Sequence, residues 1–320
     1  MMAQWKFDML ALLFPNTIRD SESLKRGTEI KYKNIPSKLY KYCNFKGRDK
    51  DNLLNRVVYM RFPKNFNDPY DCASAYYSPL NMLNYCFREN IEQLNSTLPP
   101  NINGFRFTDS EIKQIKESDN SIETANKIFA QKDATISQED VEKQCDESIE
   151  KMLTEVNANE RFKPKIDNAI VSCFSERNDL MLMWSHYTDS HKGFCLEYNF
   201  KSLPVDHETT KQIFPVIYQE NLLDVTEAIK KGGNTSFGAR ASITKSIEWE
   251  YEREWRLIIL SENERVWPVP LPQSIYIGSK IEDKNKVFLI EYARTNNIPL
   301  YKAVMSQKKF EINFEPIGDA

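Results

Sequence analysis

The stretch MLMWSHYTDSHKGFCLEYNF, residues 181–200, places a helical pattern and a strand pattern on either side of a turn. Apolar and aromatic residues recur at helical spacing from its beginning: Leu180, Met183, Trp184 and Tyr187. This spacing predicts a short helix, capped by Asp179, that turns one side toward a core. After Gly193, side chains alternate between apolar and mixed character in GFCLEYNF, which predicts a strand. The stretch is therefore a corner where a helix leads into a strand.

The strand pattern recurs along the rest of the chain. Runs of β-branched and aromatic residues occupy 38–42, 56–62, 168–175, 213–218, 253–260, 274–278 and 299–305. Helices are predicted at 221–231, ending at Gly232, and at 283–295. Because strands and helices do not alternate strictly as βαβ units, we expect an α+β fold with a mixed sheet and flanking helices.

Two segments differ from this body. Residues 79–163 are polar, rich in glutamate and lysine, and carry apolar residues at helical spacing, so we expect a helical insertion. Thr108 and Glu111 have the spacing of a capping box. Two apolar stripes support these helices: Leu80, Leu83, Phe87, Ile91 and Leu94, then Val141, Cys145, Ile149, Met152 and Val156. Residues 1–30 form an N-terminal amphipathic segment that we expect to pack on a single domain spanning 31–320, which the insertion interrupts.

Composition narrows the class of protein. The 320 residues include 43 Lys and Arg against 46 Asp and Glu, a formal net charge of −3, so no overall basic field favours nucleic acid. The six cysteines form no CxxC pair and several lie in apolar runs, which favours reduced thiols in a cytoplasmic protein. No segment approaches the ~20 apolar residues of a transmembrane helix, so we expect no membrane partner.

The two histidines of the opening stretch are candidates for a ligand site. His186 falls on the helix side that faces away from Trp184, and His191 falls in the turn. A spacing of i, i+5 across a turn is not one-face helical spacing, so we expect no metal here. Hydrogen bonds to loop carbonyls and a role in ligand binding both fit this pattern.

The segment EWEYEREWRLIIL, residues 248–260, concentrates charge at the start of a strand. If residues 252–256 are extended, Glu252, Glu254 and Arg256 share one face. Two adjacent carboxylates should not both ionise freely, so one should have a raised pKa unless Arg256 compensates. Such a pair is suited to acid–base work or to stabilising a developing cation, but a solvated edge strand has the same pattern.

A third candidate is FNDPYD, residues 66–71, a turn in which Asn67 and Asp68 can bond local backbone. Asp68, Asp71 and the Glu252–Glu254 pair could instead assemble a magnesium site, which leaves a metal-dependent nuclease open. The chain contains no GxGxxG, GxxxxGK[ST] or GxSxG motif, which disfavours Rossmann-type dinucleotide binding and P-loop hydrolysis.

Taken in order, these motifs resemble those of a bacterial family called domain of unknown function 2971. The resemblance is carried by KLYKYCNF, YMRFPKNFNDPYD, VSCFSERNDLMLMWSHYTDSHKGFCLEYNF and WEYEREWRLI, and spans about residues 38–305. Residues 79–163 fall outside these motifs.

The order of a polar-aromatic strand, a central Ser/Tyr element and a late Glu-x-Glu strand is also similar to ADP-ribosyltransferases, which bind NAD in a split mixed sheet. This resemblance implies a partly split sheet, with Lys41 or Tyr42 at the first NAD-binding position and Ser175 or Tyr187 at the second. Glu254 or Glu252 would then be the catalytic acid. The chain departs from the usual pattern because the first position lacks an arginine or histidine.

The resemblance thus implies an NAD-binding, ADP-ribosyltransferase-like effector, in a setting of anti-phage defence or toxicity. NAD would be the substrate, and a protein or nucleic acid would accept ADP-ribose unless NAD is hydrolysed. We expect the ligand to be bound by Lys41, Tyr42, Asn67, Asp68, Ser175, His186, Tyr187, His191 and Arg256. Two alternatives stay open: a non-catalytic ligand-sensing or protein-interaction module that uses the helical insertion as its contact surface, and the nuclease.

Overall fold

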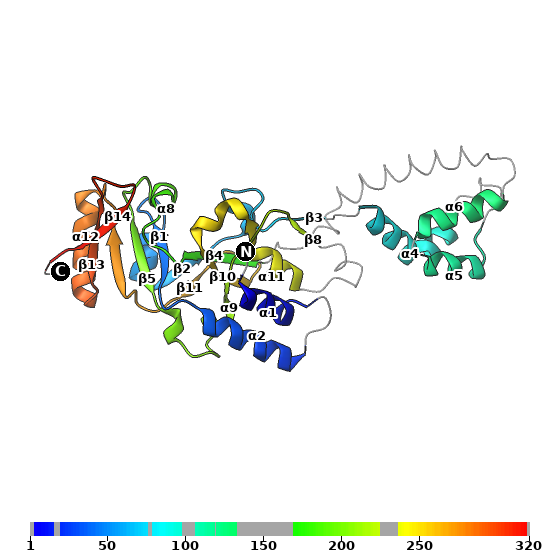
Figure 1. Cartoon of the computed structure of the whole chain (residues 1–320), viewed down its shortest axis with the longest axis horizontal. Helices are drawn as coiled ribbons and strands as arrows, with labels where there is room; N and C mark the ends of the chain where they lie inside the picture. The colour runs from blue at the N-terminus through cyan, green and yellow to red at the C-terminus, as the bar shows by residue number, and fades with distance from the viewer. Residues whose placement is uncertain are drawn as a thin grey trace. The chain divides into compact units, whose positions relative to one another are not determined.

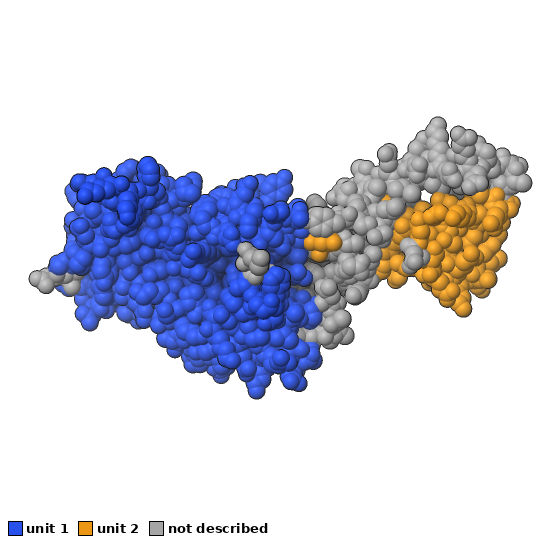
Figure 2. Space-filling view, in the orientation of Figure 1, with its two compact units in different colours: residues 1–73, 165–223, 235–320 blue, residues 74–164, 224–234 orange. Residues whose placement is uncertain are grey.

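The computed structural model describes residues 3–15, 20–75, 79–97, 106–118, 120–132, 169–224 and 236–318. The chain divides into two compact units, which are coloured separately in Figure 2. Unit 1 comprises residues 1–73, 165–223 and 235–320, and unit 2 comprises residues 74–164 and 224–234. Whether residues 31–320 behave as a single domain with a separable insertion at 79–163 stays a prediction.

An eight-stranded mixed sheet forms the body of unit 1 (Figure 1), with the order β14-β13-β12-β5-β1-β4-β10-β6. Within the sheet β12 and β13 are parallel, and the other neighbouring strands are antiparallel. In chain order the strands are β1 (Leu39–Cys43), β4 (Ala169–Ser175), β5 (Phe194–Tyr198), β6 (Ile213–Pro215), β10 (Glu254–Leu260), β12 (Ser274–Ile277), β13 (Leu300–Met305) and β14 (Ile312–Pro316). The predicted α+β class with a mixed sheet is confirmed.

The sheet is partly split between β1 and β4. Five residue pairs join β1 to β5, and seven join β4 to β10. Between β1 and β4 the ladder holds the single pair Tyr40–Ser175. The Lys41 ammonium reaches across this junction and donates hydrogen bonds to the Ser172 hydroxyl and the Cys173 carbonyl, each at 3.0 Å. The two halves of the sheet therefore separate just beyond one backbone contact.

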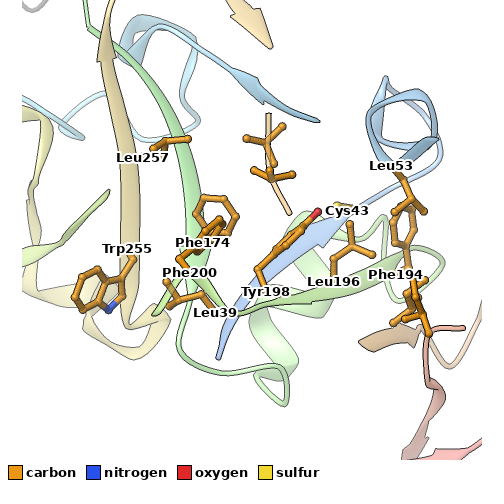
Figure 3. Close-up of a cluster of buried hydrophobic side chains, with 14 of the residues drawn as sticks. Leu39, Cys43, Leu53, Phe174, Phe194, Leu196, Tyr198, Phe200, Trp255 and Leu257 are labelled. Atoms are coloured by element: carbon orange, nitrogen blue, oxygen red, sulfur yellow. The ribbon is translucent and has the colours of Figure 1, made fainter. Parts of the chain in front are cut away.

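Both faces of the sheet are covered. One face buries a large apolar cluster that includes Leu39, Phe174, Trp255 and Leu257 (Figure 3), together with α12 (Asp283–Asn296). On the other face, α1 (Gln4–Leu13) buries Met9 and Leu13 against Val171 and Ile258. Trp5 of α1 packs against both clusters: it is half-buried and stacks on Trp255 of the first cluster with ring centroids 6.2 Å apart. The N-terminal helix thus packs on the domain, as its apolar pattern predicted.

Shorter elements connect these layers. In unit 1 the further helices are α2 (Ser21–Asn34), α3 (Asp49–Leu54), η1 (Pro63–Asn65), α8 (Met181–Tyr187), η2 (Phe200–Ser202), α9 (Glu208–Gln212), α11 (Ser236–Ser242) and η3 (Ile247–Glu252). The short strands of unit 1 are β2 (Val57–Met60), β7 (Ile217–Gln219), β9 (Thr244–Ser246) and β11 (Arg265–Pro268). β3 (Ser74–Ala75) belongs to unit 2, and β8 (Leu223–Asp224) has its first residue in unit 1 and its second in unit 2. β2 pairs with β11, and β7 runs parallel to β9.

The described part of unit 2 contains three helices, α4 (Pro79–Thr97), α5 (Asp109–Glu117) and α6 (Ser121–Lys132). They share an apolar cluster: Ile91, Ile112, Ile115, Ala125 and Ile128. The predicted capping box is present, since Thr108 accepts from the Glu111 amide and Glu111 accepts from the Thr108 amide. The second predicted stripe, from Val141 to Val156, lies outside the described residues.

Several local predictions are wrong. Asp179 does not cap α8, because its carboxylate pairs with Arg177 at 2.8 Å and Leu180 occupies the cap position. Residues 213–218 form two strands, because the Val216 amide still donates to the Glu254 carbonyl of β10 whereas the next amide, of Ile217, donates to the Ile243 carbonyl. Residues 221–224 are not helical but include β8, and the rest of the helix predicted at 221–231 lies outside the described residues.

The corner at residues 181–200 is confirmed as a helix followed by a strand. Trp184 is 0% exposed and meets Tyr42 edge-on with ring centroids 5.5 Å apart. The chain then reverses through three non-glycine residues with positive φ: Asp189, Ser190 and His191. A Cβ at Gly193 would lie 2.1 Å from the Cys43 carbonyl oxygen, so only glycine fits where this turn enters β5.

In the described part of the chain, no helix is long and apolar enough to cross a membrane. Four cysteines in this part have free thiols: Cys43, Cys72, Cys173 and Cys195.

Candidate functional site

A cavity of about 500 Å³ opens where β1 and β4 separate, within the range of ~300–1,000 Å³ that is typical of ligand sites. Its walls come from β1, β4, α8 and the segment after β2, and its charged end comes from β9, η3 and β10. All of its lining residues belong to unit 1.

The charged end is built around Lys245. The Lys245 ammonium lies 2.6 Å from a carboxylate oxygen of Glu252, 3.0 Å from Glu254 and 3.6 Å from Asp71. The four side chains are at most 5% exposed. Burial disfavours the Lys245 cation, but Glu254, Glu252 and Asp71 outweigh this effect and raise its pKa, so the ammonium stays charged.

Arg256 holds two of these three carboxylates, Glu254 and Asp71, and does not itself line the cavity. Its guanidinium is fully buried and donates to both oxygens of Glu254, from Nε at 3.0 Å and from Nη2 at 3.1 Å. It also donates to Asp71 and to the Ser242 carbonyl, each at 2.8 Å. Three carboxylates thus surround two cations. We call these five residues the charged cluster: Asp71, Lys245, Glu252, Glu254 and Arg256.

The two glutamates differ in protonation. Burial alone would raise the pKa of Glu254, but the charges of Arg256 and Lys245 outweigh it and lower the pKa to about 2. For Glu252, burial is the larger effect and raises the pKa despite Lys245. The sequence predicted that one carboxylate of the pair would have a raised pKa. The structure assigns this to Glu252 because Arg256 bonds only to Glu254 within the pair.

The backbone that presents the pair is not the continuous strand expected from the sequence. β10 begins at Glu254, and Glu252 is the last residue of η3. Between them Arg253 has a φ of 45°, in the left-handed region. Glu252 and Glu254 still converge on Lys245, because the turn at Arg253 directs the last side chain of η3 toward the first side chain of β10.

The opposite walls of the cavity carry separate cations and aromatic rings. Lys41 lies at the split of the sheet, and Arg61 is exposed and bonds through its backbone to Val171. Within the described residues, the Arg61 guanidinium has no ion-pair partner. Tyr187 from α8 is half-buried, and its hydroxyl donates to Glu252 at 2.9 Å. The rings of Tyr42, Tyr59, Phe66 and Phe174 line the space between.

The cavity brings together seven of the eleven residues predicted as catalytic or ligand-binding: Lys41, Tyr42, Asn67, His186, Tyr187, Glu252 and Glu254. Ser175 and Arg256 are 0% exposed and support the cavity without lining it. The Ser175 hydroxyl donates to the Glu252 carbonyl at 2.6 Å and accepts from the Arg177 amide, so it fixes the turn that carries the pair.

His186 and His191 have different surroundings. His186 is exposed and lines the cavity. His191 does not line it: its ring stacks on Trp184 with centroids 6.2 Å apart, and its carbonyl accepts from the Lys280 amide. The predicted hydrogen bond from the His191 ring to a loop carbonyl is not present among the described residues: its Nε2 meets the Ser185 hydroxyl at 3.3 Å, and its buried Nδ1 has no partner there. His186 lines the cavity and keeps the position of a ligand-binding residue.

A second cavity of about 530 Å³ lies on the other side of Lys245. Asp68 belongs to this cavity and not to the first, so the magnesium site considered from the sequence does not assemble there. Asn67 and Lys245 line both cavities. Among the described residues, no group of three or more His, Cys, Asp or Glu side chains is arranged to hold a metal ion.

Sequence reasoning missed Lys245 and Arg61 and used Asp71 only as a metal ligand. Lysine is mostly exposed and is almost never fully buried unless it is paired, so the sequence around Lys245 does not by itself predict a buried lysine. The neighbouring acidic residues did indicate a cation nearby, because glutamates occupy every second position at 248, 250, 252 and 254.

These features define an α+β protein with a ligand-sized cavity in a split mixed sheet. Residues 183–257 match a family model described as Protein of unknown function (DUF2971). The predicted resemblance to this family is thereby confirmed over α8, β5 and the segment that carries the glutamate pair. None of the curated proteins matches the chain. None of the solved structures matches it either.

Proposed function

We propose that the protein binds NAD in the first cavity and breaks its nicotinamide–ribose bond, transferring ADP-ribose to a macromolecule or hydrolysing NAD. One observation carries this proposal. The positions that the ADP-ribosyltransferase resemblance singles out, Lys41 and Tyr42, Ser175, and Glu254, lie on three neighbouring strands, β1, β4 and β10. Residues more than 200 positions apart in the sequence therefore contribute to one site.

The charge distribution fits the two ends of such a ligand. Lys41 and Arg61 supply cations for a diphosphate, and hydrogen bonds between such cations and phosphate oxygens are charge-assisted and strong. Glu252 and Glu254 supply acceptors for ribose hydroxyls and negative charge near a developing oxocarbenium centre. Aromatic rings between the two ends offer surfaces for the bases.

The test is chromatographic detection of nicotinamide after purified protein is incubated with NAD, with and without cell extract as a source of acceptor. We expect release by the wild type and retained release by Glu262→Gln, an exposed glutamate outside the cavity. The Lys41→Ala variant should require more NAD for the same rate, because it loses one cation of the diphosphate end. Assays in EDTA separate this activity from a magnesium-dependent nuclease.

The non-catalytic alternative is favoured by a different observation. Glu254 is held by two cations, an arrangement that also suits a rigid binding site. A thermal shift induced by NAD without nicotinamide release would select a ligand-sensing module. If NAD caused neither a thermal shift nor nicotinamide release, NAD would be excluded as the ligand. The cytoplasmic location and the anti-phage or toxin setting are proposals that rest on composition and resemblance.

A further inference from the structure

Both N-terminal helices attach to the same strand, β6, which ends the eight-stranded sheet beside β10. The Lys31 ammonium of α2 donates to the Lys211 carbonyl at 2.5 Å, just before β6 begins at Ile213. The Lys6 ammonium of α1 donates at 3.0 Å to the carbonyl of Val216, the residue that follows β6. The two lysines thus hold β6 at both of its ends. We call these two contacts the lysine clamp.

Lys31 is buried without a carboxylate partner. It is 1% exposed, and its ammonium lies 3.8 Å from the centre of the Phe214 ring of β6. Within the described residues no carboxylate forms an ion pair with it. A buried lysine is ordinarily paired, because removing an ammonium from water disfavours its charged form. Burial accordingly lowers the pKa of Lys31 from 10.5 to about 7.

The elements that pack around Lys31 supply no compensating charge. They carry these titratable side chains: Lys6 and Asp8 of α1; Glu22, Lys25, Arg26, Glu29, Tyr32 and Lys33 of α2 itself; Lys201 of η2; and His207, Glu208 and Lys211 at the start of α9 and within it. β6 has none. Burial is the only cause of the lowered pKa of Lys31, so none of these groups offsets it. Lys6 differs, because Glu176 and Glu250 raise its pKa against the effect of burial.

We propose that the lysine clamp responds to pH: α2 is held on β6 while the Lys31 amine is neutral, and uptake of a solvent proton by this amine favours release of α2. Once α2 is released, Lys31 is hydrated and titrates at its ordinary pKa of 10.5 instead of about 7. The docked state is therefore favoured fully above pH 10.5. This preference is lost as the pH falls toward 7 and changes little below 7. The inference does not depend on the cleavage of NAD.

β6 connects the lysine clamp to the strand that carries the charged cluster. Phe214, which lies against the Lys31 ammonium, is the cross-strand partner of Arg256 in β10. Val216, whose carbonyl accepts from Lys6, donates its amide to the Glu254 carbonyl at 2.9 Å. Release of α2 removes a support from the outer side of β6. We therefore expect β6 to open locally before β10 does.

Amide hydrogen exchange of the full chain at pH 7 and pH 9 tests the device, with rates expressed as protection factors so that the pH dependence of intrinsic exchange is removed. In wild type, protection of α2 and β6 should rise by about 10–100-fold from pH 7 to pH 9. Lys31→Met, which cannot be protonated, should lose this rise, and Lys33→Met, an exposed change on the same helix, should keep it. An equal rise in wild type and Lys31→Met overturns the proposal. So does an equal rise in α12, because that would be global unfolding and not release of α2.

A second measurement observes the amine itself in the wild-type protein. In protein labelled with ¹³C at the lysine Cε, the signal missing from Lys31→Met belongs to Lys31, and its pH titration reports that group directly. We expect a midpoint near 7, and a midpoint above 9 overturns the proposal. Lys31→Met should also raise the urea midpoint at pH 7, because methionine fills similar space without a buried charge. A lowered urea midpoint would show that the ammonium stabilises the docked helix, which contradicts the proposal.

Discussion

The aromatic corner, formed by Tyr42, Trp184 and His191, and the charged cluster around Lys245 are both largely buried, but burial has opposite effects on the stability of the two regions. Trp184 contributes apolar area and finds a partner for its indole nitrogen in the Asn178 carbonyl at 2.5 Å. Burial of this kind stabilises a fold directly. The charged cluster has to offset the loss of hydration of five ionic groups, which apolar residues of the same volume would not incur. Charged clusters of this kind beside a cavity are typical of functional sites.

The largest expected effect tests the aromatic corner. Replacing Trp184 by Ala should lower the free energy of unfolding by about 3–5 kcal/mol, because a large buried ring is lost and a void remains. Leu182→Ala on the same helix is the matched control, since Leu182 is 52% exposed, and it should change stability little. Urea denaturation followed by circular dichroism gives both values. Similar losses in the two variants would mean that α8 is held by other contacts.

The next effect tests the cost of the charged cluster. Arg256→Met should lower stability by about 3–5 kcal/mol, because Glu254 and Asp71 lose a buried partner. The exposed Arg26→Met on α2 provides the control. The double variant Arg256→Met, Glu254→Leu removes one cation and one anion together and should recover most of the loss while nicotinamide release stays absent. A double variant no more stable than Arg256→Met would show that the cluster itself stabilises the fold.

A smaller effect should appear in the pH dependence of stability. Glu254 has a folded pKa of about 2, below its ordinary value of 4.5, so its ion pairs contribute fully above pH 4.5 and are lost progressively as the pH falls toward 2. Urea midpoints measured from pH 6 to pH 3 should fall less steeply in Glu254→Gln than in wild type. Glu262→Gln, an exposed substitution with the same change in charge, should keep the wild-type slope.

The smallest effect on stability is expected at His186. This side chain is exposed and lines the first cavity, so His186→Ala should leave the melting temperature nearly unchanged while weakening NAD binding. Calorimetric titration measures the second quantity. If His186→Ala lowered the melting temperature as much as Trp184→Ala, His186 would have a structural role in the aromatic corner. If it left the NAD affinity unchanged, His186 would not belong to the NAD site.

The sequence predicted correctly those features that depend on the local spacing of residue types. Alternating apolar strands, the Trp184 stripe and the Thr108–Glu111 capping box depend on local spacing, and each is present in the structure. The sequence placed Glu252 and Glu254 on one face because it predicted a continuous strand. The two side chains do converge, but Arg253 turns the chain between them and only Glu254 lies in the strand. Lys245 was missed although Glu252, its nearest partner, lies only seven positions later, and its third carboxylate partner, Asp71, lies 174 positions earlier. Contacts of that range depend on how the whole sheet is assembled.

Lys245 and Asn67 line both cavities, so a ligand that displaces the Lys245 ammonium in one cavity also changes the wall of the other. A ligand in the second cavity that draws the Lys245 ammonium toward itself takes a donor away from Glu252, and a ligand on Glu252 changes the charge that the second cavity presents. Linkage requires this influence to be reciprocal and equal in free energy. The affinity of each cavity for its ligand would therefore depend, through the Lys245 ammonium, on whether the other cavity is occupied.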